Sequence, residues 1–111
     1  MQLKNRFIHH VFFWLNTPAS EEDLQKLIAG LRKLSAVPDI REFHIGLPAD
    51  TRRDVIDHSY SVSWMLMFDD GAAQERYQEH PIHLNFVSEC SRLWKKVLVY
   101  DSKECRETSD D

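Results

Sequence analysis

The chain has 111 residues, of which 42% are hydrophobic and 29% are charged, so it has the size of one ordinary domain and the composition of a globular protein. These figures exclude multidomain, fibrous and disordered architectures. The formal net charge of −4, from 14 Lys and Arg against 18 Asp and Glu, argues against nucleic acid as a partner, because binding to phosphates requires an excess of basic side chains.

The chain contains two cysteines, Cys90 and Cys105, which form neither a disulfide framework nor the spacing of a zinc or redox motif. We therefore expect a reducing, cytoplasmic location. No stretch approaches the roughly 18 apolar residues that span a bilayer, and the first residues lack the cleavage site of a signal peptide. A membrane is thus not an expected partner.

The first strand and the first helix are predicted from the spacing of apolar residues. The aromatic and β-branched residues 7–15 have the length of a strand, and both of its faces are apolar apart from one histidine each, His9 and His10. A helix follows, with Ser20 as its N-cap and Pro38 beyond its end. Its apolar residues recur at helical spacing: Leu24, Leu27, Ile28, Leu31 and Leu34.

Two further strands are predicted over residues 40–47 and 60–68, where apolar and polar residues alternate. The polar segment 48–59 between them is expected to form a loop.

The last elements are two helices and a strand. Asp70 is suited to cap a helix over residues 72–79, which ends at His80 because that residue precedes Pro81. Proline favours the first position of a helix, so a third helix is predicted from Pro81 onward. Residues 96–101 form the last strand. We expect a single domain over residues 1–102 and a charged, disordered tail over residues 103–111.

The predicted order β-α-β-β-α(α)-β is that of an α+β, ferredoxin-like fold with a four-stranded antiparallel sheet. Helices cover one face of such a sheet and leave the other face open. Here the open face is also apolar, because the first strand has apolar residues on both faces. An apolar surface of that size indicates a partner, and we expect a homodimer through sheet-to-sheet packing.

Three blocks of residues resemble a known family. The segment from His9 to Leu15, the segment from Tyr77 to His83, which contains His80-Pro81-Ile-His83, and the segment from Trp94 to Asp101 together resemble the stress-responsive A/B barrel (Dabb) domains, a family that includes olivetolic acid cyclase. The resemblance implies a dimeric α+β barrel of two four-stranded sheets. It implies no single activity, since many members of the family have no assigned reaction.

The resemblance to the cyclase implies a candidate catalytic set of Tyr77, His83 and His10, and it implies no cofactor. A neutral imidazole at His83 can remove a proton next to a carbonyl, while the phenol of Tyr77 hydrogen-bonds the oxygen on which charge develops. His10 is the nearest match to a histidine of the first strand that faces the pocket there. Its neighbour His9 then faces the opposite way, towards a dimer interface.

Three other interpretations of these residues stay open. In the first, the chain is a structural or stress-associated dimer in which His80 caps a helix and His83 is a core histidine. In the second, the chain is a cofactor-free monooxygenase, by analogy of fold alone. In the third, His80 and His83 bind a metal; we expect none, because no third ligand accompanies them. The ligand of a pocket between sheet and helices would be small and hydrophobic or aromatic.

Overall fold

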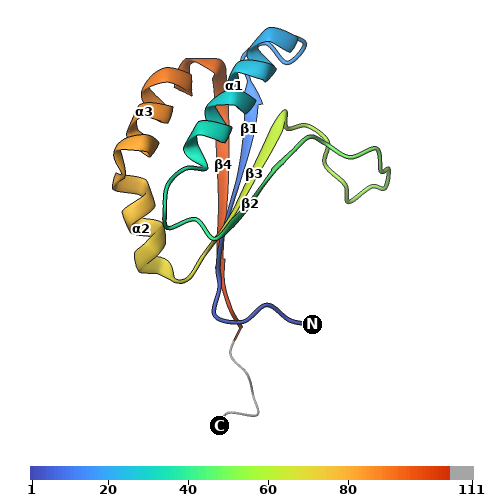
Figure 1. Cartoon of the computed structure of the whole chain (residues 1–111). Helices are drawn as coiled ribbons and strands as arrows, with labels where there is room; N and C mark the ends of the chain where they lie inside the picture. The colour runs from blue at the N-terminus through green and yellow to red at the C-terminus, as the bar shows by residue number, and fades with distance from the viewer. Residues whose placement is uncertain (106–111) are drawn as a thin grey trace.

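The computed structural model describes residues 1–105 and has the predicted ferredoxin-like order of strands and helices. Three helices cover one face of a four-stranded antiparallel sheet whose strand order is β2-β3-β1-β4 (Figure 1). The elements are β1 (Phe7–Leu15), α1 (Glu21–Leu34), β2 (Glu42–Gly46), β3 (Val62–Phe68), α2 (Gly71–Glu79), α3 (Pro81–Cys90), a 3-10 turn (Ser91–Leu93) and β4 (Trp94–Lys103).

The helices begin where the sequence predicts. The hydroxyl of Ser20 accepts a hydrogen bond from the Asp23 amide at 3.1 Å and caps α1, and Asp70 caps α2 by accepting from the Ala73 amide at 2.8 Å. The apolar stripe of α1 lies against the sheet, with Leu27, Ile28, Leu31 and Leu34 buried.

The strands differ from prediction at their ends. β2 is shorter than expected, because the amide of Ile40 bonds to the carbonyl of Val37 in a turn before the strand begins. β4 is longer than expected, because it pairs with β1 along the whole of that strand, from Phe7 opposite Lys103 to Leu15 opposite Trp94. Of the predicted tail 103–111, Lys103 belongs to β4, and residues 106–111 lie outside the described residues.

The register of the sheet decides which side chains face the helices. Val11 of β1 lies opposite Trp64 of β3 and Val99 of β4, and Val11 and Trp64 belong to the core beneath the helices. The alternate residues form the opposite surface, which we call the open face. Its apolar members are Ile8, Phe12, Trp14, Met65, Met67, Leu98 and Tyr100.

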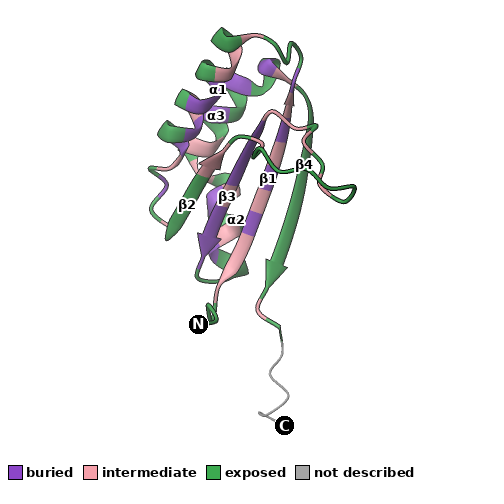
Figure 2. Ribbon diagram, turned by 90° about the vertical axis from the view of Figure 1, so that its right-hand side faces the viewer, coloured by how far each residue is buried: buried purple, intermediate pink, exposed green. Residues whose placement is uncertain are grey.

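Burial is uneven across the sheet. In Figure 2 the open face is turned to the viewer; β3 is mostly buried, whereas β4 is exposed along nearly all its length. Val97 and Val99 are each 44% exposed although they lie on the helix side of the sheet, so the helices do not fully cover β4. None of the helices in residues 1–105 has the length and apolar character needed to cross a bilayer.

Candidate functional site

A cavity of about 170 Å³ lies between the sheet and helices α2 and α3. Its walls are mainly apolar, and three polar aromatic side chains with titratable groups reach it: His9 from β1, Tyr77 from α2 and His83 from α3. The ring centroid of Tyr77 lies 5.8 Å from that of His9 and 4.8 Å from that of His83. We call His9, Tyr77 and His83 the pocket triad.

His9 is held by a carboxylate on the neighbouring strand. Its side chain is almost completely buried, and Nδ1 lies 2.6 Å from Oδ1 of Asp101, the residue directly opposite on β4. A carboxylate only accepts hydrogen bonds, so Nδ1 carries the proton in this pair. In the neutral ring Nε2 is then left as a hydrogen-bond acceptor.

Tyr77 is oriented by the indole of Trp64. The Trp64 Nε1 group donates to the Tyr77 hydroxyl oxygen at 3.1 Å, and both side chains are buried. Burial raises the pKa of Tyr77 to about 12, although the hydrogen bond from Trp64 opposes the shift. The phenol therefore keeps its proton at neutral pH and can donate it in a hydrogen bond to a ligand oxygen.

His83 is the least satisfied member of the pocket triad. Within the described residues its Nδ1 is buried and has no hydrogen-bond partner. Burial lowers the pKa of His83, the Gln78 backbone near the ring raises it, and His9 lowers it further. The ring is thus neutral at pH 7, the form in which an imidazole acts as a base.

The expected placement of His9 and His10 is reversed in the structure. His10 lies on the open face, on the other side of the sheet from the pocket, where its ring stacks on Phe12 at 4.3 Å between centroids. Burial, followed by the charges of His44 and His9, lowers the pKa of His10. The histidine of β1 that reaches the pocket is His9.

His80 lies outside the pocket triad and caps α3. Its Nδ1 accepts a hydrogen bond from the Ile82 amide at 3.1 Å.

Within residues 1–105, no group of three or more His, Cys, Asp or Glu side chains is arranged to hold a metal ion.

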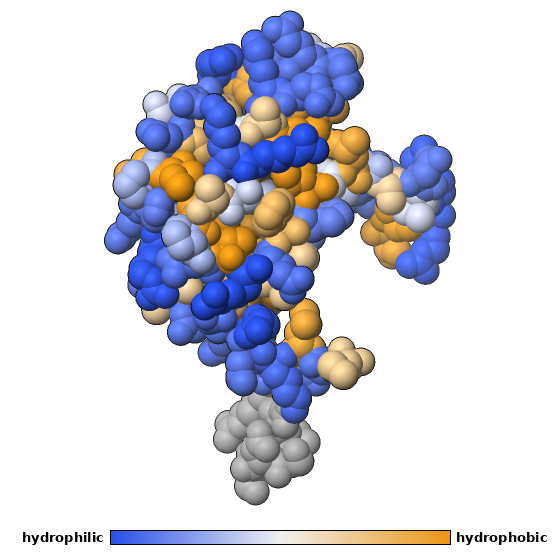
Figure 3. Space-filling view, viewed as in Figure 1, coloured by the Kyte–Doolittle hydropathy of each residue, from blue (hydrophilic) through white to orange (hydrophobic). Residues whose placement is uncertain are grey.

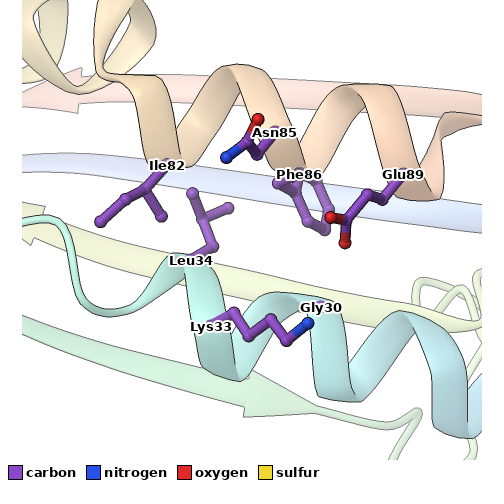
Figure 4. Close-up of a pocket in the computed structure, with 7 residues that line it drawn as sticks. All are labelled: Gly30, Lys33, Leu34, Ile82, Asn85, Phe86 and Glu89. Atoms are coloured by element: carbon purple, nitrogen blue, oxygen red, sulfur yellow. The ribbon is translucent and has the colours of Figure 1, made fainter.

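A second cavity, of about 290 Å³, lies between α1 and α3 (Figure 4). Its lining includes the buried apolar side chains of Leu34 and Phe86, and its charged lining residues, Lys33 and Glu89, are exposed to solvent. A charge in contact with water is strongly screened. Lys33 and Glu89 therefore discriminate between ligands by charge less strongly than the pocket triad does in the first cavity.

Solved structures with the same fold support the architecture. A Dabb family protein with a ferredoxin-like fold from Mesorhizobium loti is 25% identical, with a TM-score of 0.75, and the match covers 91% of this chain and 98% of that one. A dimeric ferredoxin-like protein of unknown function from Thermobifida fusca is 16% identical, with a TM-score of 0.72 and coverage of 94% and 95%. Hydroxynitrile lyase from Passiflora edulis is 19% identical, with a TM-score of 0.75 and coverage of 95% and 98%.

Among curated protein sequences none matches the chain. The family model of the stress-responsive A/B barrel domain (Dabb), however, matches residues 7–104. This match contains all of the helices and strands and every member of the pocket triad. The chain therefore belongs to the stress-responsive A/B barrel domain family.

Proposed function

We propose that this chain is a homodimeric Dabb protein that binds a small hydrophobic or aromatic carbonyl compound and moves a proton on it without a cofactor. The observation that carries the proposal is the convergence of a neutral imidazole and a protonated phenol, those of His83 and Tyr77, on one apolar cavity. Apolar pockets with a few converging polar groups are typical of ligand sites.

The chemistry follows from the protonation states of His83 and Tyr77. The neutral ring of His83 takes a proton from the carbon next to the carbonyl, and the electron pair moves onto the carbonyl oxygen. The Tyr77 hydroxyl donates a hydrogen bond to that oxygen as its negative charge develops. Return of the proton from His83 to carbon or oxygen completes the transfer and regenerates the neutral base.

His9 supports the same chemistry from the opposite wall. Because Asp101 holds the proton on Nδ1, Nε2 can accept a hydrogen bond from a ligand hydroxyl or stabilise a proton during transfer. We assign this place to His9 and not to His10, which lies across the sheet.

The size of the cavity limits the ligand. At about 170 Å³, it is smaller than the range of about 300–1,000 Å³ that is typical of pockets for drug-sized ligands. A ligand with a single ring therefore fits this volume best. A longer apolar tail would leave the cavity along β4, where Val97 and Val99 line it and are each 44% exposed.

The dimer in this proposal forms through the open face. That surface is apolar over β1, β3 and β4, and Leu98 and Tyr100 are 36% and 61% exposed. A second copy packed sheet to sheet removes these side chains from water, and the similar protein from Thermobifida fusca is described as dimeric. Light scattering at micromolar concentration tests this part: a mass of one chain would contradict it.

A reducing, cytoplasmic location belongs to the same proposal. Both cysteines are free thiols, and Cys105 is exposed, so an oxidising compartment would leave an accessible thiol open to intermolecular disulfides.

The ligand is tested by thermal-shift screening against aromatic and polyketide-like acids, ketones and aldehydes. We expect compounds that stabilise the wild type and lose their effect in His83→Ala and Tyr77→Phe. His10→Ala is the matched control, because it removes the neighbouring histidine on the other side of the sheet; ligand stabilisation should survive it. Stabilisation that is unchanged in both pocket variants would contradict the site.

Proton transfer is tested separately by NMR in D2O. A bound ketone should exchange its α-protons for deuterium faster with the wild type than with His83→Ala. Binding without exchange would leave a ligand-binding protein and would overturn the catalytic part of the proposal.

A further inference from the structure

Residues 47–61 join β2 to β3 and form a projection that we call the arm. In Figure 1 the arm extends from the sheet on the side away from the helices, and in Figure 3 it stands apart from the body of the molecule. It therefore occupies space on the side of the open face.

The tip of the arm is braced by its own hydrogen bonds. The Ile56 amide donates to the Arg53 carbonyl at 2.9 Å, the Ser59 amide donates to Asp57 Oδ1 at 2.7 Å, and the His58 ring bonds to the Thr51 carbonyl across the neck of the loop. These bonds close the segment into a compact loop of defined shape.

The base of the arm is fastened to β1. The indole Nε1 of Trp14 donates to the Ser59 hydroxyl at 3.1 Å, and the Ser61 amide donates to the Phe13 carbonyl at 2.7 Å. The direction in which the arm projects is thus set by the sheet itself.

This braced loop presents apolar side chains to solvent. Val55 at the tip is 79% exposed and Leu47 at the base is 55% exposed, and part of the surface of the arm is apolar in Figure 3. A loop whose polar groups bond to one another while a valine points outward has the character of a contact surface.

The open face contains a recess that matches this tip in chemistry. The recess has a volume of about 200 Å³, and its walls are side chains of the sheet together with two from the arm of the same chain: Phe12, Trp14, Leu98 and Tyr100, with Asp57 and Tyr60. Among these side chains, the ring of Phe12 lies 5.0 Å from that of Tyr60 and 6.1 Å from that of Tyr100, measured between centroids. Phe12 and Leu98 lie opposite each other near the middle of β1 and β4.

We infer that the arm of each protomer reaches over the sheet of a second copy and places Val55 in the recess of that copy. This inference rests on the homodimer of the proposed function. Packed sheets lie about 10 Å apart, so the tip of an arm that rises from the open face comes within reach of the open face of the second copy. Under two-fold symmetry the contact is made twice.

Charges of both signs lie on each side of the contact, so opposite charges can pair across it. Arg52, Arg53 and Asp54 precede Val55 in the arm. At the recess lie the carboxylate of Asp57, which is a lining residue, and Lys96, whose Nζ atom is 4.5 Å from the centroid of the Trp14 ring. The hydroxyl and amide of Ser59 lower the pKa of Asp57, so it is ionised when an arginine of the second copy approaches.

The contact is tested first by dissociation of the dimer, measured by sedimentation equilibrium. Val55→Asp should weaken the dimer at least about tenfold, because a charge replaces an apolar side chain at two symmetric contacts. Leu84→Asp is the matched control: Leu84 is 56% exposed on α3, on the helix side of the sheet, and its substitution should leave the dimer unchanged. Circular dichroism checks that both variants are folded.

Cross-linking then locates the partner of the tip. A benzophenone amino acid at position 55 is introduced into protein mixed from ¹⁴N- and ¹⁵N-labelled chains, and cross-linked peptides are identified by mass spectrometry. We expect mixed-isotope cross-links to peptides containing residues 7–15 or 94–103. If Val55→Asp leaves the dimer intact and the cross-links stay within one chain, the inferred contact of the arm is wrong. The proposed dimer itself is not overturned by that result. A wild-type protein that is monomeric overturns the proposed dimer as well.

Discussion

The indole of Trp64 donates a 3.1 Å hydrogen bond to the hydroxyl oxygen of Tyr77. Both side chains are at most 2% exposed, so this bond connects β3 to α2 inside the core and fixes the phenol beside the pocket. A buried donor that loses its acceptor also loses its hydration, at a cost of about 1–3 kcal/mol.

Tyr77→Phe should therefore lower the free energy of unfolding by about 1–3 kcal/mol, because the Trp64 N–H is left without its acceptor. Trp64→Phe should cost more, since it also leaves a cavity. The double variant should be more stable than the sum of the two losses predicts, by about 1 kcal/mol. Urea denaturation of the four proteins measures this coupling; strictly additive losses would show that the bond contributes nothing.

The pair of His9 and Asp101 predicts a single tautomer for a buried histidine. With Nδ1 2.6 Å from the carboxylate, the neutral ring should carry its proton on Nδ1. Long-range ¹H–¹⁵N NMR spectra report this directly, and Asp101→Ala should shift the population towards the Nε2–H form that free imidazole side chains prefer. A wild-type ring already protonated on Nε2 would contradict the assignment of Nε2 as the acceptor in the pocket.

The burial of His83 should make the folded chain less stable at acidic pH. Burial lowers the pKa of His83 in the folded chain below the ordinary value of about 6.5, so at mildly acidic pH the unfolded chain binds more protons than the folded one. The free energy of unfolding therefore falls as the pH drops below about 6.5 and is recovered as the pH rises.

This prediction is measured by NMR titration of the His83 ring, whose midpoint should lie below 6.5. Replacing the ring with an uncharged side chain in His83→Asn should reduce the dependence of the free energy of unfolding on pH between about 5 and 7. His10 contributes a dependence of the same sign, so some slope should persist in the variant. A midpoint at or above 6.5 would contradict a buried neutral base.

The fold could be predicted from local patterns because each element carries its own signal. The leucine spacing of α1, the Ser20 cap and the proline at the start of α3 each act within a few residues. The ends of β2 and β4 could not be predicted in this way, since they depend on the partners of each backbone amide.

The sequence predicts the site less completely than it predicts the fold, and the reason is physical. Tyr77 and His83 lie six residues apart on two consecutive helices, so the sequence indicates that they are neighbours. For His9 and His10 the choice of face depends on the register of β1, and a strand that is apolar on both faces gives no indication of it. Asp101 was missed as the partner of His9 because the two residues are 92 positions apart and meet only across the paired strands β1 and β4.

The absence of a side chain at Gly30 allows α1 and α3 to pack closely. A Cβ atom at this position would lie 2.6 Å from the Sγ atom of Cys90 and 3.3 Å from the ring of Phe86, and Figure 4 shows Gly30 on the side of α1 that faces α3. Alanine favours a helix by about 1 kcal/mol over glycine, but overpacking costs about 1–3 kcal/mol. Gly30→Ala should therefore lower the free energy of unfolding by about 1 kcal/mol.

Two comparisons distinguish this steric cause from a general effect of alanine. Gly71, at the start of α2, has open space around its Cβ position, so Gly71→Ala should leave stability unchanged or raise it by about 0.5 kcal/mol. In the Gly30→Ala background, Cys90→Ala removes the sulfur that the new methyl group meets, so the double variant should lose less stability than the two single losses combined. Urea denaturation measures all four variants. A Gly30→Ala protein more stable than the wild type would show that the two helices can separate at little cost.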